Sequence, residues 1–390
     1  MWARDDGWPY GLGMRGMITG GSVLEPGAPE PVAGSLAWSN DTISAVGADI
    51  DEPWDVVVDA TGCWVLPGIV DIHGDAFERA LMPRPGVPVA LGPALDDNDV
   101  QLLAAGITTS FLSATDSWEP GLRSRETLRA LADALPKRRG GPRLLLHVRH
   151  ERCNTRDLHE IIDWLDDGTI RLLSYNDHTP GGIVHVKGLT PGQIARSGVS
   201  EDELAARLEH AVGQRSRGMT QEEEISAAAA RAGVVTASHD PAEQADLERD
   251  LDLGIGFAEF PITIELAHRY RDEGVPVLLG APNLVRGGSH LGNLSVLDAV
   301  AEDAVDVLCS DYHYPSLLQA PFVLTAKGLA STAAAWSMVS ARAAAAAGLD
   351  DRGVLEPGKL ADVVVVEPPS DGAPKVRAAI VGGAVVYQRS

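Results

Sequence analysis

Eight short apolar runs, each followed by a polar or helix-like stretch, constrain the fold of this chain more than any other feature. Runs that are apolar throughout are typical of strands buried on both faces of a parallel sheet, and the alternation of strand with helix indicates such a sheet. Eight strand–helix units are what a closed (β/α)8 TIM-like barrel needs. The runs cover 66–73, 106–113, 143–150, 169–176, 234–240, 254–261, 275–282 and 305–311.

The two ends of the chain have a different pattern. From about residue 16 to 66, and again near the C-terminus, short β-type segments alternate with Gly, Pro, Asn and Asp. A chain of 390 residues, 45% of them hydrophobic, is long enough for a large barrel and a small accessory unit. We therefore predict an α/β fold in which 66–350 form the barrel, while 1–65 and 351–390 together form a small β-sandwich domain.

The charge and the cysteines exclude several classes of function. The net charge is −23, and no cluster of Lys and Arg suggests binding to a nucleic acid or a membrane surface. No apolar run approaches the roughly 18 residues of a membrane span. Cys63, Cys153 and Cys309 are far apart and form no CxxC pair, so we expect no disulfide framework and a cytoplasmic location. A small anionic substrate would need local positive charge from metal ions or a few arginines.

Side chains that ligate metals follow five of the eight runs. Barrel enzymes keep their chemistry at these C-terminal strand ends, and imidazole and carboxylate groups suit Zn²⁺ and similar divalent ions. A single histidine at such a position is more often a hydrogen-bonded core residue, but five matching strand ends favour a metal site with one or two ions. The candidates are His73 and Asp75 after the first run, Glu151 after the third, His178 after the fourth, His239 after the fifth and Asp311 after the eighth.

Asp311 has two possible roles. It could be the N-cap of a helix near Ser316–Leu318, since Asp is a favoured capping residue. The preceding apolar strand favours a place in the metal site, where the carboxylate would bind metal and take the proton from the attacking water. A metal ion makes that water more acidic.

Two loops have the composition of anion-binding segments. Glycines let backbone N–H groups approach an anion and arginine offers a two-pronged donor, and barrels often hold phosphates in the loops after strands 7 and 8. A Gly-Gly pair is also a common plain turn, and a Pro-Arg-Pro sequence can be no more than a rigid loop. The candidates are Arg84 after the first run and, after the seventh, Asn283, Arg286, Gly287, Gly288, Ser289 and His290.

The order of these residues resembles the amidohydrolase superfamily. That pattern usually opens with His-x-His, continues with a carbamylated Lys or a Glu and two His, and ends with an Asp. No lysine of this chain stands at the end of a barrel strand, so Glu151 is the candidate for the third position. His178 and His239 follow the fourth and fifth runs, whereas the superfamily usually uses strands 5 and 6.

A more specific resemblance is to the diphosphatases of the carbon–phosphorus lyase pathway, which hydrolyse α-D-ribose 1-methylphosphonate 5-triphosphate to the 5-phosphate and pyrophosphate. It implies that His73, Asp75, Glu151, His178, His239 and Asp311 form the metal site. The matching stretches run in order from about 64 to 318 and include LPGIVDIHGDAFERALMPRPGV, VRHERC, NDHTPG, ASHDPA and GAPNLVRGGSHLGN.

The segment after His178 departs from the family pattern. Where relatives have a Gln-rich stretch, this chain has Gly182-Ile183-Val184-His185. We expect residues 180–230, with helices at 200–212 and 220–232, to cover the mouth of the active site.

The sequence therefore predicts a metal-dependent hydrolase of phosphonate metabolism that cleaves a phosphoanhydride. An amidohydrolase or deaminase that cleaves a C–N bond on the same fold is an alternative, since a fold does not fix a reaction. A barrel that binds metal without turnover is another. The expected partner is a small phosphorylated substrate, and a homo-oligomer remains open.

Overall fold

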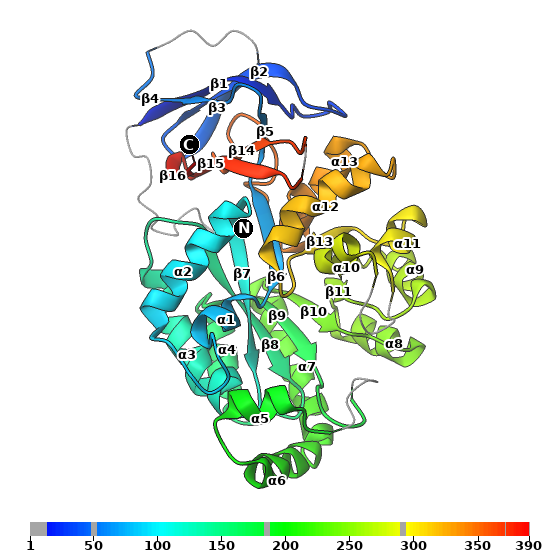
Figure 1. The fold of residues 1–390 in the computed structure, drawn as a ribbon. Coiled ribbons are helices and arrows are strands. Elements are labelled where there is room, and N and C mark those ends of the chain that lie inside the picture. The colour runs from blue at the N-terminus through cyan, green and yellow to red at the C-terminus, as the bar shows by residue number, and fades with distance from the viewer. Residues whose placement is uncertain (1–13, 48–52, 183–187, 289–293, 371, 390) are drawn as a thin grey trace.

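The computed structural model describes residues 14–47, 53–182, 188–288, 294–370 and 372–389. Its strands form two sheets that lie end to end, with helices around the larger one (Figure 1). No helix among the described residues is long and apolar enough to cross a membrane.

The larger sheet is a barrel of eight parallel strands, one for each apolar run, so the predicted barrel is confirmed. Neighbours pair in the order of the sequence, and a parallel bridge between Gly74 and Asp311 brings the last strand back to the first. These strands are β6 Ile69–Gly74, β7 Ile107–Asp116, β8 Arg143–Glu151, β9 Ile170–Asn176, β10 Val235–His239, β11 Phe257–Glu259, β12 Val277–Gly280 and β13 Val307–Cys309.

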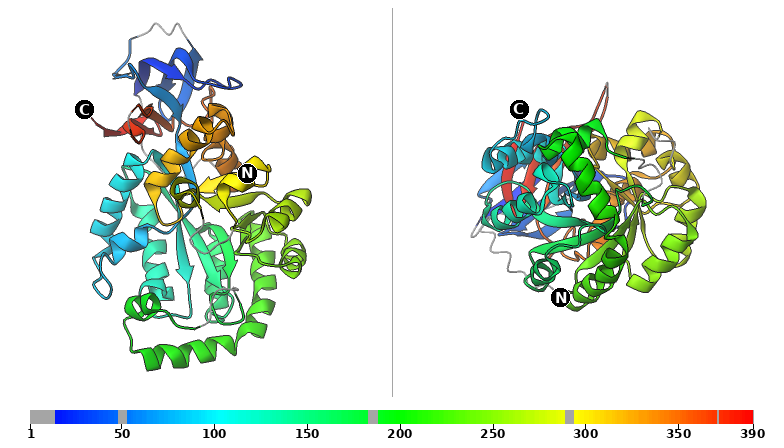
Figure 2. Two further views of the ribbon diagram at one scale, coloured as in Figure 1. Left: turned by 45° about the vertical axis from the view of Figure 1, so that its right-hand side comes forward. Right: turned by 90° about the horizontal axis from the view of Figure 1, so that it is seen from below.

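Helices surround the barrel, as Figure 2 shows from below. Buried leucines, isoleucines and alanines on their inner faces join the strands in one large apolar cluster. The helices are α1 Phe77–Leu81, α2 Leu91–Ala104, α3 Arg125–Ala134, α4 Leu158–Asp166, α5 Pro191–Ser197, α6 Glu201–Val212, α7 Arg215–Ala232, α8 Gln244–Leu253, α9 Ile264–Asp272, α10 Ala281–Arg286, α11 Val296–Ala301, α12 Tyr314–Ala326, α13 Thr332–Ser337 and α14 Ala341–Ala346.

The smaller sheet is built from both ends of the chain, as expected. Its order is β16-β15-β14-β5-β1-β2-β3, with β4 beside β1, and it is mixed because β1 runs parallel to β4 and β5 but antiparallel to β2. Its strands are β1 Arg15–Val23, β2 Val32–Ser39, β3 Thr42–Gly47, β4 Val56–Asp59, β5 Trp64–Pro67, β14 Val363–Glu367, β15 Lys375–Val381 and β16 Ala384–Gln388.

This sheet folds over a core of its own. Trp38 in β2 donates from Nε1 to the carbonyl oxygen of Gly383, in the turn between β15 and β16, at 2.7 Å. Because β2 and β16 lie at opposite sides of the strand order, the sheet must curl to make this contact. Only Gly68 separates β5 of the small sheet from β6 of the barrel, so the barrel strands point their C-terminal ends away from the small sheet (Figure 1).

The segment predicted to cover the mouth forms α5, α6 and α7 at the far end of the barrel (Figure 2). The helix predicted at 200–212 agrees with α6, while α7 begins at Arg215, before the predicted start at 220. None of the described residues of 180–230 lines the pocket discussed below. Leu204 and Ala211 of α6 pack instead against Trp118 and Cys153.

Candidate metal centre

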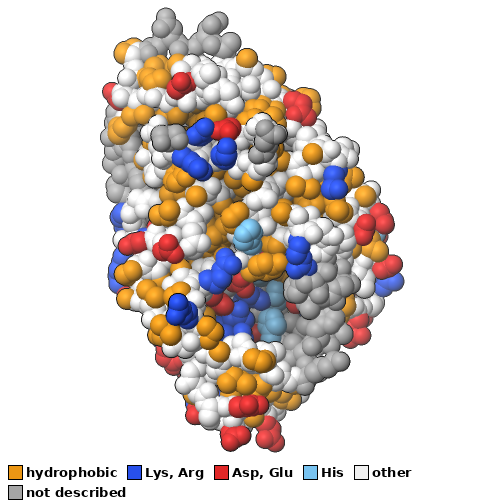
Figure 3. Space-filling view, viewed as in Figure 1, with side chains coloured by type: hydrophobic (Ala, Val, Ile, Leu, Met, Phe, Trp, Pro, Cys, Tyr) orange, Lys and Arg blue, Asp and Glu red, His pale blue; other side chains and the backbone are white. Residues whose placement is uncertain are grey.

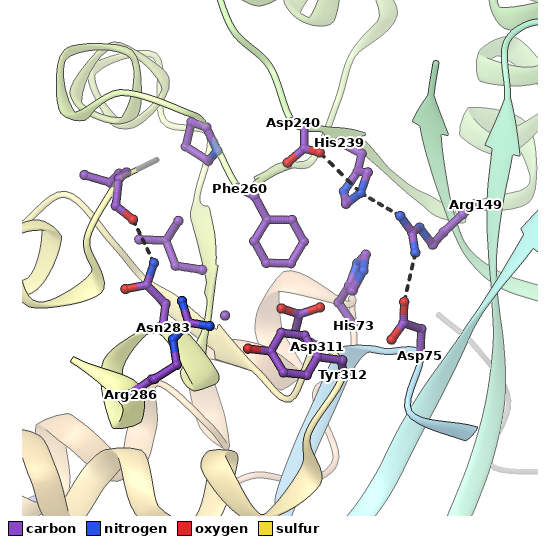
Figure 4. Close-up of a pocket in the computed structure, with 14 residues that line it drawn as sticks. His73, Asp75, Arg149, His239, Asp240, Phe260, Asn283, Arg286, Asp311 and Tyr312 are labelled. Carbon is purple, nitrogen blue, oxygen red and sulfur yellow. Dashed lines mark hydrogen bonds and ion pairs between the residues drawn. The ribbon is translucent and has the colours of Figure 1, made fainter. Parts of the chain in front are cut away.

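A pocket opens at the C-terminal ends of the barrel strands, where positive, negative and histidine side chains gather in a hollow of the surface (Figure 3). Apolar walls come from Phe260, Leu279 and Leu294. The ionisable groups that line it are His73, Asp75, Arg149, His239, Asp240, Arg286 and Asp311 (Figure 4).

His73, in β6, is held by a buried carboxylate. Its Nδ1 lies 2.7 Å from Oε1 of Glu259, the last residue of β11. Burial, reinforced by the charge of Arg149, holds the pKa of His73 well below its usual value, so the ring is neutral. A neutral ring that donates from Nδ1 to Glu259 keeps the lone pair of Nε2 available to a ligand.

His239, at the end of β10, stacks near His73, with the ring centroids 5.2 Å apart. Its Nδ1 lies 3.4 Å from the second oxygen of Glu259. On the other side of the ring, Nη2 of Arg149 lies 2.6 Å from Nε2. Burial and the neighbouring Arg149 also hold the pKa of His239 well below its usual value. One carboxylate, Glu259, therefore faces both histidines.

Glu151, at the end of β8, holds His178 with its carboxylate, as Glu259 holds His73. One carboxylate oxygen accepts the backbone N–H of His178 at 2.9 Å, and the other bonds Nδ1 of the ring. The His178 ring lies 5.5 Å from that of His239. Burial raises the pKa of Glu151, but the charge and hydrogen bonds of His178 outweigh it, so the pKa is lowered overall. Both oxygens of Glu151 are thus engaged in orienting His178.

Asp311 follows β13 and lines the pocket between His73 and Tyr312 (Figure 4). Helix α12 begins at Tyr314 with His313 in the N-cap position, so Asp311 does not cap it. Burial, followed by the charge of Asp75, raises the pKa of Asp311 to about 8. A carboxyl group with such a pKa is suited to proton transfer near neutral pH.

Three residues just beyond the C-terminal ends of barrel strands have left-handed backbone conformations. Asp240, Phe260 and Asp311 have φ of 53°, 57° and 53°. Aspartate adopts this region at moderate cost, whereas a bulky Phe does so rarely. Such strain is concentrated at functional sites, and here all three side chains face one pocket (Figure 4).

The residues present fit a divalent metal ion. Two groups of described residues each bring three ligand atoms within 4.8 Å of one another, and His239 belongs to both. These ligand atoms are imidazole nitrogens and carboxylate oxygens, which are the donors that Zn²⁺ and similar divalent ions take in proteins. The groups are His73, His239 and Glu259, and His178, His239 and Asp240.

The structure brings the predicted metal-site residues into one region. His73, Asp75, His239 and Asp311 line the pocket, with Asp75 lying 3.5 Å from Nη1 of Arg149. His178 adjoins His239, and Glu151 lies behind His178. The sequence order also holds: His178 follows the fourth barrel strand and His239 ends the fifth.

The predicted anion-binding residues are more scattered. Asn283 and Arg286 line the pocket, but the Asn283 side chain is engaged with the backbone of Leu294 and Val296 at 3.1 Å. Arg286 is exposed and donates to the carbonyl oxygen of Gly288.

Gly287 ends α10 with φ of 85°, a position that favours glycine. Arg84 is exposed in a turn closed by its bridge to Val87, outside the pocket lining. Ser289 and His290 lie outside the described residues.

Sequence reasoning missed Glu259 and Arg149. Glu259 ends the sixth barrel strand as His239 ends the fifth, and it is the one acidic residue of the sixth apolar run, so the sequence could have indicated it. Arg149 lies inside a strand, and an arginine in an apolar run was the only sign that the strand borders a polar pocket.

Comparison with known proteins identifies relatives over most of the chain. A model of the amidohydrolase family matches residues 309–387. The chain is 32% identical over 358 residues to the alpha-D-ribose 1-methylphosphonate 5-triphosphate diphosphatase of Escherichia coli, an alignment that covers 86% of this chain and 91% of the relative.

Solved structures share the fold at lower identity. A prolidase complexed with N-methylphosphonate-L-proline is 15% identical with a TM-score of 0.62, covering 96% of this chain and 100% of that one. A Xaa-Pro dipeptidase with bound methionine is 14% identical with a TM-score of 0.65, with the same coverage. At these identities the likeness establishes the fold alone.

Proposed function

Because this chain belongs to the amidohydrolase superfamily, and within it to the family of the ribose 1-methylphosphonate 5-triphosphate diphosphatase, we propose that it cleaves a phosphoanhydride of a small phosphorylated substrate. The chain is a metal-dependent hydrolase of phosphonate metabolism. The proposed reaction converts α-D-ribose 1-methylphosphonate 5-triphosphate to the 5-phosphate and pyrophosphate. The observation that supports it best is a pocket in which histidines and carboxylates lie beside Arg149 and Arg286.

We assign the metal to the histidine side of the pocket and propose Zn²⁺, bound as one or two ions. The nitrogens of His73, His178 and His239 and the carboxylates of Asp75 and Asp311 would hold it, since Zn²⁺ prefers nitrogen and oxygen ligands of this kind. A bound ion would supply a Lewis acid at the phosphoryl oxygen and acidify a water molecule.

Asp311 is the proposed proton acceptor. It is partly buried, its pKa is raised to about 8, and its side chain faces the pocket beside His73. In its ionised form it would take a proton from the attacking water, and it would later release that proton to the leaving group or to solvent.

Arg149 and Arg286 are the proposed contacts for the anionic substrate. The whole chain carries a net charge of −23, which opposes the approach of a polyphosphate, so the pocket has to supply local positive charge. Arg286 stands at the exposed rim and Arg149 at the buried floor. Phe260, Leu279 and Leu294 would keep bulk water away from the charges between them.

Arg286→Ala provides the test of the substrate class. A charge-assisted hydrogen bond contributes about 1.5–3 kcal/mol, so the KM for a triphosphate should rise about tenfold to a hundredfold. The rise should be smaller for a monophosphate. The measurement is pyrophosphate release from ribose-triphosphate substrates, set beside ammonia or amine release from a panel of amides.

Arg84→Ala is a matched control, because Arg84 is an exposed arginine outside the pocket lining. It should leave the KM for the triphosphate near that of the wild type. Efficient turnover of an uncharged amide, unaffected by Arg286→Ala, would contradict the phosphoanhydride assignment and leave the metal site standing.

A further inference from the structure

Arg149 lies among the metal-site residues and not outside them. It projects from β8 with only 4% of its surface exposed. Nη2 contacts Nε2 of His239 at 2.6 Å, and Nη1 lies 3.5 Å from Oδ2 of Asp75 (Figure 4). The Nε of Arg149 is buried without a hydrogen-bond partner among the described residues. The guanidinium therefore bridges a histidine and a carboxylate while one of its own donors stays unsatisfied.

The contact with Arg149 fixes the proton on His239. A guanidinium has donors and no acceptor and stays charged in proteins. Nε2 of His239 must therefore accept with its lone pair, and the ring proton belongs on Nδ1. Nδ1 faces Oε2 of Glu259 at 3.4 Å, which is consistent with a proton on that side of the ring.

A metal ion in the pocket would need the same lone pair. Each unprotonated imidazole nitrogen has one lone pair, directed in the ring plane, and it serves either a hydrogen bond or a metal bond. His239 belongs to the group formed with His178 and Asp240, and its Nε2 lies 3.8 Å from Oδ2 of Asp240. Arg149, which also lines the pocket, contacts the same Nε2.

Electrostatic repulsion also opposes simultaneous binding of Arg149 and a metal ion at Nε2 of His239. Two cations that share one nitrogen as their partner would lie only a few ångströms apart in a buried site, where Coulomb repulsion is strong. Asp75 offers an alternative partner, because its carboxylate already lies 3.5 Å from the other prong of the guanidinium. A side chain that leaves His239 therefore has an anion within reach.

We propose that Arg149 competes with the metal ion for Nε2 of His239, so that metal binding displaces the guanidinium from the histidine toward Asp75. This rests on the metal-site part of the proposed function and goes beyond it. Arg149 is a positioning residue, and the position of its guanidinium changes when metal binds. The displaced guanidinium then becomes available to an anionic substrate.

The test compares metal affinity in variants that keep or remove the competing charge. Zn²⁺ and Co²⁺ binding is measured without substrate, by competition with a chromophoric chelator, in the wild type, Arg149→Gln and Arg149→Lys. Arg149→Gln should bind metal about tenfold more tightly or better, because the ion no longer displaces a cation. Arg149→Lys keeps the charge and should lie closer to the wild type.

Arg286→Gln is the matched control, since it removes one positive charge from the same pocket without contacting His239. It should tighten metal binding much less than Arg149→Gln. Thermal unfolding of each metal-free variant checks that the fold is kept. Unchanged or weaker metal binding by folded Arg149→Gln would overturn the proposal, as would an equal gain in Arg286→Gln.

A spectroscopic readout separates competition from a general change in the site. In NMR spectra of protein with ¹⁵N-labelled histidine, metal binding should strongly change the ¹⁵N chemical shift of Nε2 of His239, while Nδ1 keeps its proton. A metal-induced change at Nδ1 would place the ion beside Glu259 and overturn the proposal. Wild-type protein that binds no metal contradicts the metal site as well, whereas bound metal without an Arg149 effect contradicts this inference alone.

Discussion

His73 and His239 present stacked rings to one carboxylate, Glu259. Replacing either histidine with alanine removes a ligand and leaves the buried Glu259 with less compensation, so His73→Ala and His239→Ala should lose bound metal and turnover. Metal content after dialysis and pyrophosphate release measure the two effects. His268→Ala is the control, since His268 is 41% exposed on α9. Full activity in a metal-depleted variant would contradict the assignment.

Asp311→Asn tests the proton-transfer role. Asparagine keeps the shape of the side chain and also tolerates the left-handed backbone at this position, where φ is 53°. Removing a general base should lower kcat by about 10²-fold or more, with little change in thermal stability because Asp311 caps no helix. A variant that loses stability but keeps kcat would assign Asp311 a structural role.

The raised pKa of Asp311 also predicts that metal binding releases protons. With a pKa of about 8 in the metal-free protein, the group is mostly protonated at about pH 7, and a metal ion requires the carboxylate. Release should approach one proton from this group at about pH 7 and vanish at about pH 10, so metal affinity rises with pH across this window. A pH-indicator dye in weakly buffered solution measures the protons released when metal is added. The Asp311→Asn variant should release about one proton fewer than the wild type.

At the residue scale, the candidate metal ligands were easier to predict from the sequence than the side chains that contact and orient those ligands. His73, His178, His239 and Asp311 stand where strands end, which makes them visible in a linear pattern. Glu151 was recognised, but its engagement with His178 depends on the distance between two strands. Arg149 could not be assigned, because its contact with His239 joins residues from β8 and β10.

At the scale of elements, the barrel is closed by a contact between its first and last strands. Asp71 in β6 accepts the backbone N–H and the hydroxyl of Ser310 at 3.0 and 2.6 Å, and both residues are fully buried. Asp71→Ala leaves two buried donors unpaired, at about 1–3 kcal/mol each, so the free energy of unfolding should fall by about 2–6 kcal/mol. Urea unfolding measures this change.

Ser310→Ala is the milder comparison for Asp71→Ala. It removes the hydroxyl but keeps the backbone N–H bond to Asp71, so its loss of unfolding free energy should be smaller. An equal or larger loss in Ser310→Ala would mean that the hydroxyl, and not the carboxylate, secures the closure.

The barrel strands were predictable because strands buried on both faces consist mainly of apolar residues. All eight barrel strands coincide with apolar runs, since parallel strands are covered on both faces. Boundaries were harder to predict. Helix α7 starts at Arg215 without a side-chain cap, so no capping residue in the sequence marked the beginning of that helix.

At the scale of the whole molecule, strand β14 joins the two sheets into one body. Val364 and Val366 pack in the barrel cluster, and Val363 and Val365 pack in the core of the small sheet. We therefore expect both units to unfold in a single thermal transition, with ellipticity and metal release changing together. Two separate transitions would show that the barrel stands without the small sheet.

The pairing of Val65 in β5 with Val365 in β14 also has a consequence for biosynthesis. The partner of β5 is translated 300 residues later, from 65 to 365, which takes roughly 15–60 s at about 5–20 residues per second. Until then the inner edge of β5 is open beside a growing barrel. Ribosome-bound chains of this protein thus carry an unpaired apolar strand edge for most of their synthesis, which is the kind of surface that nascent-chain chaperones cover.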